Sequence, residues 1–144
     1  MKVLFDTSVV VAAFINFHPA HNRSLSWLQK AVKKQIEGLV SVHSLIEIYS
    51  VITRLPLSPK IGTDLALKLI RENILNNFKL ITYNTEDYID LLDSMEKNNI
   101  SGGASYDGLI LRAAEKSKAD KIITLNVNDF IRVSPGLVDK ISEP

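Results

Sequence analysis

The sequence predicts an α/β fold, a three-layer sandwich in which a parallel sheet of about five strands lies between helices. Short apolar runs of strand length recur along the chain, and longer segments with helical spacing of apolar residues separate them. Strands joined by helices pair in parallel and bury both faces of the sheet. The 144 residues, 46% of them hydrophobic and 23% charged, suffice for one domain with its own core, spanning residues 1–144.

The first half of the chain alternates between strand and helix. Residues 2–5 form a continuous apolar run typical of a buried strand, and residues 7–15 are predicted to be helical. A second helix is expected over residues 22–36, with Asn22 as its N-cap and Gly38 just beyond its end. The remaining elements of this half are a strand at 39–42, a helix at 44–54 that stops before two X-Pro pairs, and a helix at 62–76.

The second half repeats the alternation. Thr85 opens a helix that carries Glu86 and Asp87 in its first turn, where negative charge suits the helix dipole. The expected elements are a strand at 79–81, helices at 85–97 and 105–118 separated by a loop at 98–103, a strand at 121–125, and a fifth strand at 137–138.

Composition narrows the function classes. The chain has no cysteine, which excludes disulfides, thiolate nucleophiles and cysteine-based zinc sites, and which suits a reducing cytosol. A net charge of +1 provides no strong overall field toward nucleic acid or membrane. We find neither the apolar stretch of a signal peptide nor a run of about 18 apolar residues that would span a membrane. A small soluble cytoplasmic protein is therefore expected.

Acidic residues follow several of the predicted strands. Asp6 ends the strand at 2–5, Glu47 comes just after the second strand, and Asn126 and Asp129 follow the strand at 121–125. The carboxyl ends of parallel strands share one edge of the sheet, where ligands bind in open α/β folds. Asp107 opens the helix that leads into the fourth strand. The sequence therefore predicts that these side chains converge.

Each of these residues also has a purely structural interpretation. Asp6 could cap the helix that follows it, and Ser44 to Glu47 fits the S-x-x-E capping box. Asp107 lies in a first helical turn, where a negative charge is favourable. Asn126 and Asp129 are common turn residues.

Converging carboxylates repel one another, and burying them is costly unless a positive charge lies between them. A hard divalent cation such as Mg²⁺ or Mn²⁺ takes oxygen ligands and is the natural partner. Such an ion can orient a water molecule, lower its pKa and stabilise charge on a phosphodiester. In a chain without cysteine, an all-oxygen metal site is the simplest metal hypothesis.

Four segments in order make the chain resemble the PIN-domain ribonucleases, most closely the small VapC-type toxins of prokaryotic toxin–antitoxin pairs. The resemblance spans nearly the whole chain. The segments are Val3-Leu4-Phe5-Asp6-Thr7-Ser8, Ser44-Leu45-Ile46-Glu47-Ile48, Tyr106-Asp107-Gly108-Leu109-Ile110-Leu111-Arg112-Ala113-Ala114 and Ile123-Thr124-Leu125-Asn126-Val127-Asn128-Asp129-Phe130.

The resemblance implies metal-dependent RNA hydrolysis. Asp6, Glu47 and Asp107 would form the acidic metal site, with Mg²⁺ or Mn²⁺ as the cofactor, and either Asn126 or Asp129 would be the fourth residue. It further implies a five-stranded sheet, a homodimer and inhibition by a cognate antitoxin protein. Thr7 or Ser8 would support Asp6 or a bound water by hydrogen bonding. Basic residues near the rim would position RNA phosphates, the candidates being Arg23, Lys30, Lys33, Lys34 and Arg54.

Other interpretations stand beside this one. A non-catalytic PIN-like module that binds RNA or protein would share the fold, and a receiver-type signalling domain is also a small α/β sandwich. A receiver needs an acidic pair after its first strand, whereas Asp6 stands alone. We interpret His18 and His21 as loop residues and His43 as a structural or surface residue. Trp27 and Tyr49 are expected to serve the core or a dimer contact.

Overall fold

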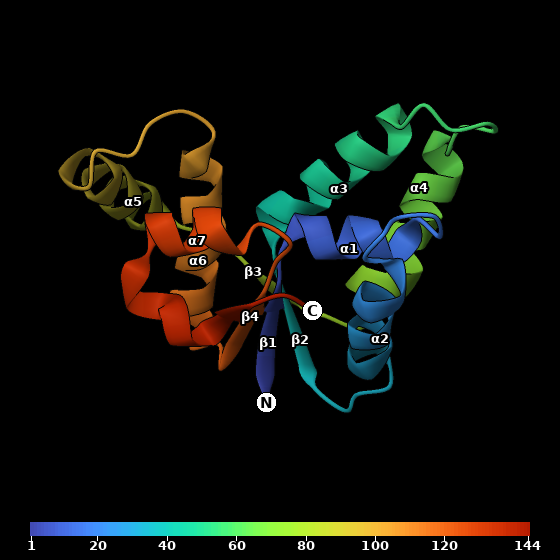
Figure 1. The fold of residues 1–144 in the computed structure, drawn as a ribbon, viewed down its shortest axis with the longest axis horizontal. Coiled ribbons are helices and arrows are strands. Elements are labelled where there is room, and N and C mark those ends of the chain that lie inside the picture. Colours follow the sequence, from blue (N-terminus) through green and yellow to red (C-terminus); the bar gives the residue numbers. More distant parts are fainter.

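A five-stranded parallel sheet forms the centre of the computed structural model, which describes residues 1–144, and helices cover both faces of the sheet (Figure 1). This confirms the predicted three-layer α/β sandwich. The strands lie in the order β3-β2-β1-β4-β5, with β1 in the middle. Their bounds are β1 (Lys2–Phe5), β2 (Glu37–Ser41), β3 (Lys79–Ile81), β4 (Lys121–Ile123) and β5 (Ile141–Ser142).

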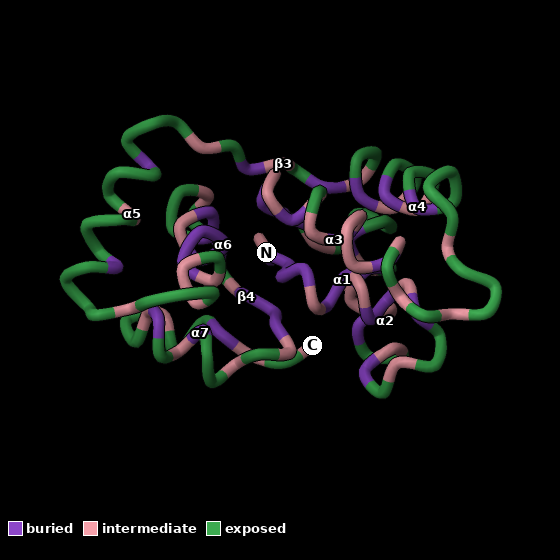
Figure 2. The backbone as a smooth tube through the Cα atoms, turned by 90° about the horizontal axis from the view of Figure 1, so that it is seen from above, coloured by how far each residue is buried: buried purple, intermediate pink, exposed green.

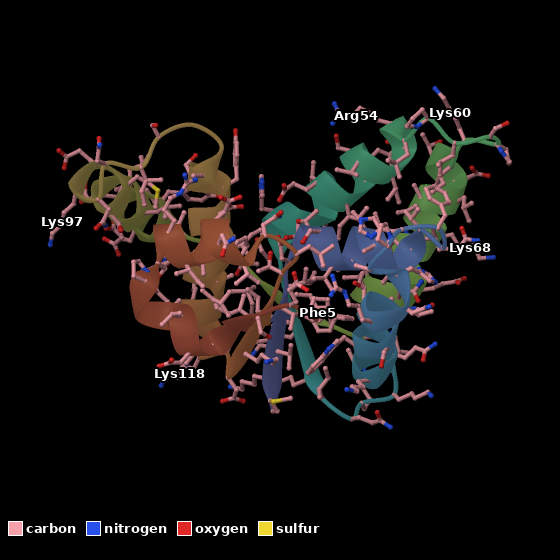
Figure 3. All side chains as sticks on the ribbon, viewed as in Figure 1. Phe5, Arg54, Lys60, Lys68, Lys97 and Lys118 are labelled. Atoms are coloured by element: carbon pink, nitrogen blue, oxygen red, sulfur yellow. The ribbon has the colours of Figure 1, made fainter.

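The central strand β1 is buried on both faces of the sheet, so its apolar residues do not alternate with polar ones. Val3 and Phe5 pack into the core on one face of the sheet, Leu4 packs into the core on the other, and all three are fully buried. A parallel strand covered on both sides reads as a continuous hydrophobic run for this reason. Figure 3 shows Phe5 on the side of the sheet that α1 and α2 cover.

Two groups of helices form the outer layers (Figure 1). The first four helices enclose the core around Val3 and Phe5, whereas α6 and α7 cover Leu4, and α5 packs against α6. The bounds are α1 (Thr7–Phe14), α2 (His21–Val32), α3 (Val42–Arg54), α4 (Thr63–Ile70), the π-helical turn η1 (Arg71–Leu75), α5 (Thr85–Lys97), α6 (Ala104–Ser117), α7 (Val127–Val133) and the 3₁₀ turn η2 (Pro135–Lys140).

The second helix and second strand differ from the sequence prediction. Helix α2 starts at His21 after Ala20, so Asn22 is not its N-cap, and it ends at Val32. Gly38 lies inside β2 instead of marking the end of a helix. A Cβ atom on Gly38 would lie 2.7 Å from the Phe78 ring and 2.9 Å from the Ala31 Cβ atom. The glycine is therefore needed for close packing, which a sequence pattern does not distinguish from a helix stop.

The predicted fifth strand at 137–138 was wrong. Those residues belong to η2, and the edge strand is Ile141–Ser142, which pairs with β4. The strand is too short to carry a periodic signal, and only Ile141 of its two residues is buried. Helix α7 was also absent from the prediction, because Asn126 and Asp129 suggested a turn.

Helix α3 starts earlier than predicted, and this frees Glu47 for the site. Its N-cap is Ser41, whose side chain accepts a hydrogen bond from the His43 backbone N–H group. The capping box expected between Ser44 and Glu47 does not form, because Ser44 is buried inside the helix and its hydroxyl has no hydrogen-bond partner. Glu47 is thus not used as a capping residue.

Helix α5 is fixed to α6 through a buried carboxylate. Asp87 completes a capping box with Asn84 and also accepts hydrogen bonds from Lys116 and Arg112 of α6. The hydrogen bond from Lys116, aided by the Asn84 N–H group and by Arg112, lowers the pKa of Asp87 to about 2.

None of the helices has the length and apolar content that crossing a lipid bilayer requires.

The close packing at Gly38 gives a stability prediction. Gly38→Ala should lower the free energy of unfolding by about 1–3 kcal/mol, the usual effect of overpacking, because both the Phe78 ring and the backbone carrying Ala31 must move. Gly136→Ala is the matched control, since its Cβ atom would meet nothing within 4 Å. Urea unfolding followed by circular dichroism compares the two variants. Equal stability of both would contradict the assigned packing.

Candidate metal site at the carboxyl edge of the sheet

A pocket of about 480 Å³ opens at the carboxyl end of β1. Figure 2 looks onto this edge of the molecule, with α1 and α3 on one side of β1 and α6 on the other. All three of these helices supply side chains to the pocket, together with the segment that follows β4. Its lining includes Asp6, Thr7, Ser8, Glu47, Asp107 and Asn126, six residues singled out from the sequence.

Asp6 is the buried base of the pocket. Its side chain lacks the geometry of a capping hydrogen bond to α1, although the Ser8 and Thr7 N–H groups lie near enough to help lower its pKa. The Ser8 hydroxyl donates to its Oδ2 atom at 2.5 Å, and the Thr124 hydroxyl donates to the same atom at 2.8 Å. Neither of these hydroxyls donates to the Oδ1 atom of Asp6. Burial raises the pKa of the Asp6 carboxyl, and the hydrogen bonds from Ser8 and Thr124 oppose this rise.

The two hydroxyls also tie Asp6 to the segment after β4. The Ser8 hydroxyl accepts a hydrogen bond from the Leu125 N–H group, and the Thr124 hydroxyl accepts one from the Asn126 N–H group. Each hydroxyl therefore donates to the carboxylate and accepts from the backbone. This arrangement fixes the position of Asn126 relative to Asp6, although 120 residues of chain separate the two.

Glu47 lies on the α3 wall of the pocket and is held by two neighbours. The Thr7 hydroxyl donates to its Oε1 atom at 3.2 Å, and Nε2 of His43 lies 3.4 Å from the same atom. Thr7 thus supports Glu47, whereas Ser8 supports Asp6. About a third of the Glu47 side chain is exposed, so the carboxylate can reach solvent in the pocket.

Asp107 faces the other acidic residues from the first turn of α6. Burial raises the pKa of its carboxyl to about 6, and the negative charges of Asp6, Asp129 and Glu47 add to this rise. The charge of Arg132 acts in the opposite direction. Asp107 is thus close enough to three other carboxylates for their charges to disfavour its ionised form.

Asn126 and Asp129 occupy different places. Asn126 lines the pocket that contains Asp6, Glu47 and Asp107, and also lines a neighbouring hollow. Asp129 lines only the neighbouring hollow, where it is exposed and lies 3.6 Å from Arg132. Asp129 therefore acts on the pocket through its charge, whereas Asn126 presents an amide to it.

The donors in this pocket suit a hard cation. Three carboxylates and an amide offer oxygen atoms, which Mg²⁺ and Mn²⁺ prefer, and no sulfur ligand is available. As the side chains stand, no three His, Cys, Asp or Glu residues are grouped closely enough to hold a metal ion together. The carboxylates of Asp6, Glu47 and Asp107 line the same open pocket.

Sequence reasoning gave no role in the site to Thr124, which lies behind the pocket and bonds Asp6, or to His18. Thr124 was quoted as part of a motif but given no role, although a threonine directly after a strand is well placed to bond a carboxylate on the neighbouring strand. His18 was interpreted as a loop residue, yet it lines the pocket. Its Nδ1 atom accepts a hydrogen bond from the Ala20 N–H group, so the neutral ring carries its proton on Nε2.

Two of the five basic residues expected near the rim, Lys30 and Lys34, lie elsewhere. The Lys34 ammonium donates to the Asn77 carbonyl just before β3, and Lys30 lies over the Trp27 ring, which also faces Lys121 at the start of β4. These contacts belong to the amino edge of the sheet. Arg23 pairs with Glu143 near the C-terminus. Arg132 is the cation whose charge reaches Asp107.

Comparisons with known proteins show the family of this chain. The family model for the PIN domain matches residues 3–134. Ribonuclease VapC27 of Mycobacterium tuberculosis is 32% identical over 115 residues, which cover 80% of this chain and 78% of that protein. Ribonuclease VapC40 of the same species is 29% identical over 119 residues, covering 83% and 82% of the two chains.

Solved structures share the fold at lower identity. Mycobacterium tuberculosis VapC20, a toxin that cleaves the sarcin-ricin loop, superposes with a TM-score of 0.69 at 12% identity, over 88% of this chain and 92% of that one. VapBC2 from Rickettsia felis, bound to a promoter DNA fragment, gives a TM-score of 0.68 at 19% identity, over 100% and 99%. FitAcB from Neisseria gonorrhoeae gives 0.65 at 16%, over 91% and 92%.

The electrostatic strain at Asp107 gives a second stability prediction. In EDTA near neutral pH, Asp107→Asn should stabilise the protein, because it removes a charge that three carboxylates and burial disfavour. Since solvent screens this partly exposed group, we expect about 1 kcal/mol, equal to roughly 2–4 °C in Tm.

The pH dependence of this gain tests its cause. The pKa of Asp107 is about 6 in the folded protein and 3.8 is its usual value, so the folded state binds the extra proton between these limits. The stabilisation by Asp107→Asn should therefore be full above pH 6 and should disappear as the pH falls toward 3.8. Thermal melts across this range measure it. A gain that does not change with pH would contradict the electrostatic origin.

Proposed function

This chain belongs to the PIN-domain ribonucleases, and we propose that it is a VapC-type toxin that hydrolyses RNA phosphodiester bonds with Mg²⁺ or Mn²⁺ as cofactor. The observation that carries the proposal is the convergence of Asp6, Glu47 and Asp107 on one pocket, where their charges act on one another. Membership of this family also argues against the receiver-type alternative.

Asp6 and Asp107 would hold the cation most directly. The Oδ1 atom of Asp6 receives no hydroxyl hydrogen bond, and Asp107 is disfavoured as an isolated charge, so both would gain from a positive partner. A bound divalent cation would supply neutralising charge, activation of a water molecule and stabilisation of the phosphodiester in the transition state. Asn126 would complete the site from the opposite wall, with Asp129 contributing through its charge.

Glu47 would orient the attacking water and accept its proton. The Thr7 hydroxyl and His43 both contact the Oε1 atom of Glu47, and about a third of this side chain is exposed, so the carboxylate can accept from a water molecule. The water oxygen forms a bond to phosphorus, one P–O ester bond breaks, and the leaving alkoxide takes a proton from solvent. The products are a phosphate monoester and a free hydroxyl group.

Phosphate positioning would come from groups at the pocket and its rim. His18 lines the pocket and carries a proton on Nε2 in its neutral form, so it can donate to a phosphate oxygen. Arg132 is largely exposed and its charge lowers the pKa of Asp107, so its guanidinium would lie within electrostatic range of the scissile phosphate. Such contacts determine affinity and not sequence choice.

We also propose a homodimer, a cognate antitoxin protein as partner, and action in the cytoplasm. The similar VapBC2 and FitAB structures are both bound to DNA fragments. Exposed apolar side chains on α3 and α5, namely Ile46, Ile89 and Leu92, offer surface for protein contacts.

Cleavage of a mixed RNA pool tests the proposed activity. Purified protein should cut RNA with Mg²⁺ or Mn²⁺ and not with EDTA. Asp6→Asn and Asp107→Asn should each lower the rate by roughly 10²-fold or more, because each removes a carboxylate that holds the cation. Asp93→Asn, on the exposed surface of α5, is the matched control and should cut like the wild type.

Two results would overturn the proposal. Wild type and both site variants cutting alike would mean that the pocket is not the source of activity. Binding of RNA and metal without any cutting would favour a non-catalytic binding module.

A further inference from the structure

Two aromatic rings stack between α3 and α6, beside residues of the candidate site. His43 of α3 and Tyr106 of α6 have ring centroids 5.5 Å apart and planes that differ by 2°. Each ring stands next to a proposed functional residue. Tyr106 directly precedes Asp107, and Nε2 of His43 lies 3.4 Å from the Glu47 carboxylate. The stack therefore joins the two helices that carry Glu47 and Asp107.

Tyr106 remains largely exposed in spite of this contact. The relative exposure of Tyr106 is 57%. One face of a ring can rest on His43 while the rest remains open to solvent. The ring belongs to neither of the two hydrophobic cores. Tyr106 is thus held parallel to His43, beside an acidic pocket, without being buried.

The support for the ring is rigid. His43 is held in the first turn of α3, where its N–H group donates to Ser41, and Tyr106 lies in the first turn of α6. Both helices are anchored by buried residues on opposite faces of the sheet. A ring fixed in advance loses little conformational entropy when a second planar group stacks on it.

We propose that Tyr106, backed by His43, is a stacking subsite for the base of a nucleotide adjacent to the phosphate that is cleaved. The inference rests on the proposed function, which places that phosphate at Asp6 and Asp107. The Tyr106 ring stacks on His43, whose Nε2 atom lies 3.4 Å from the Glu47 carboxylate, so the base and the phosphate would belong to the same or neighbouring nucleotides. Stacking on an aromatic ring is sequence-tolerant, and it requires a single-stranded, unpaired base.

Binding of single-stranded oligoadenylate tests the subsite. The measurement is fluorescence anisotropy of labelled oligomers of about ten nucleotides, a length within known single-strand site sizes. Ca²⁺ replaces Mg²⁺, and a gel verifies that the oligomer stays intact. A second probe is an abasic ribose-phosphate chain of equal length, which has the same charge but no bases to stack.

Tyr106→Ala should weaken oligoadenylate binding by roughly 5- to 150-fold, the usual effect of losing one base–aromatic stack. It should leave binding of the abasic chain unchanged. Tyr106→Trp keeps a ring and should bind oligoadenylate at least as tightly as the wild type. Tyr88→Ala is the matched control, because Tyr88 is a similarly exposed tyrosine on α5 that contacts the Tyr83 ring and not His43.

Three results would overturn the subsite: an unchanged affinity of Tyr106→Ala for oligoadenylate, an equal loss on both probes, or no binding of oligoadenylate by the wild type. Cleavage of the RNA pool separates this from failure of the proposed function. A protein that cuts RNA but binds independently of Tyr106 has the function without the subsite. A protein that binds through Tyr106 but never cuts has the subsite without the function.

Discussion

The pair of hydrogen bonds from Ser8 and Thr124 to one oxygen of the buried Asp6 carboxylate is the interaction on which the rest of the site depends. Both donors also accept from backbone N–H groups of the segment after β4. The first strand, the first helix and the fourth strand therefore meet at a single carboxylate. Because that carboxylate is buried at the carboxyl end of the central strand, the packing around it fixes its place in the lining of the pocket.

Function and stability oppose one another at this edge. Asp107 is held where burial and three other carboxylates raise its pKa to about 6, a cost to the folded state near neutral pH. A divalent cation would reverse the sign of these interactions, since the same carboxylates would then attract a shared partner. Elsewhere the protein treats acidic groups differently. Asp87 is buried too, but two cations of α6 compensate it fully and its pKa falls to about 2.

The fold could be predicted because strands such as residues 2–5 are buried on both faces and are therefore continuously apolar. Segments whose apolar residues have helical spacing separate these strands. Asp6, Glu47 and Asp107 could be found because strand ends in a parallel sheet share one edge, and because the residues resemble a family pattern. The details depended on packing between distant segments. In the sequence Gly38 resembles the end of a helix, whereas in the structure it is needed for close packing against Phe78. Thr124 and His18 had no periodicity to identify them, and Lys30 and Lys34 turned out to lie at the opposite edge.

The central claim is that the converging carboxylates form a cation site. Direct binding of Mn²⁺, followed by the electron paramagnetic resonance of the free ion near neutral pH, tests it without relying on an RNA target. The wild type should bind Mn²⁺, and Asp6→Asn should weaken that binding by about tenfold or more, since it removes the fixed, buried charge of the site. Absence of Mn²⁺ binding by the wild type, or equal affinity in both proteins, would contradict the account.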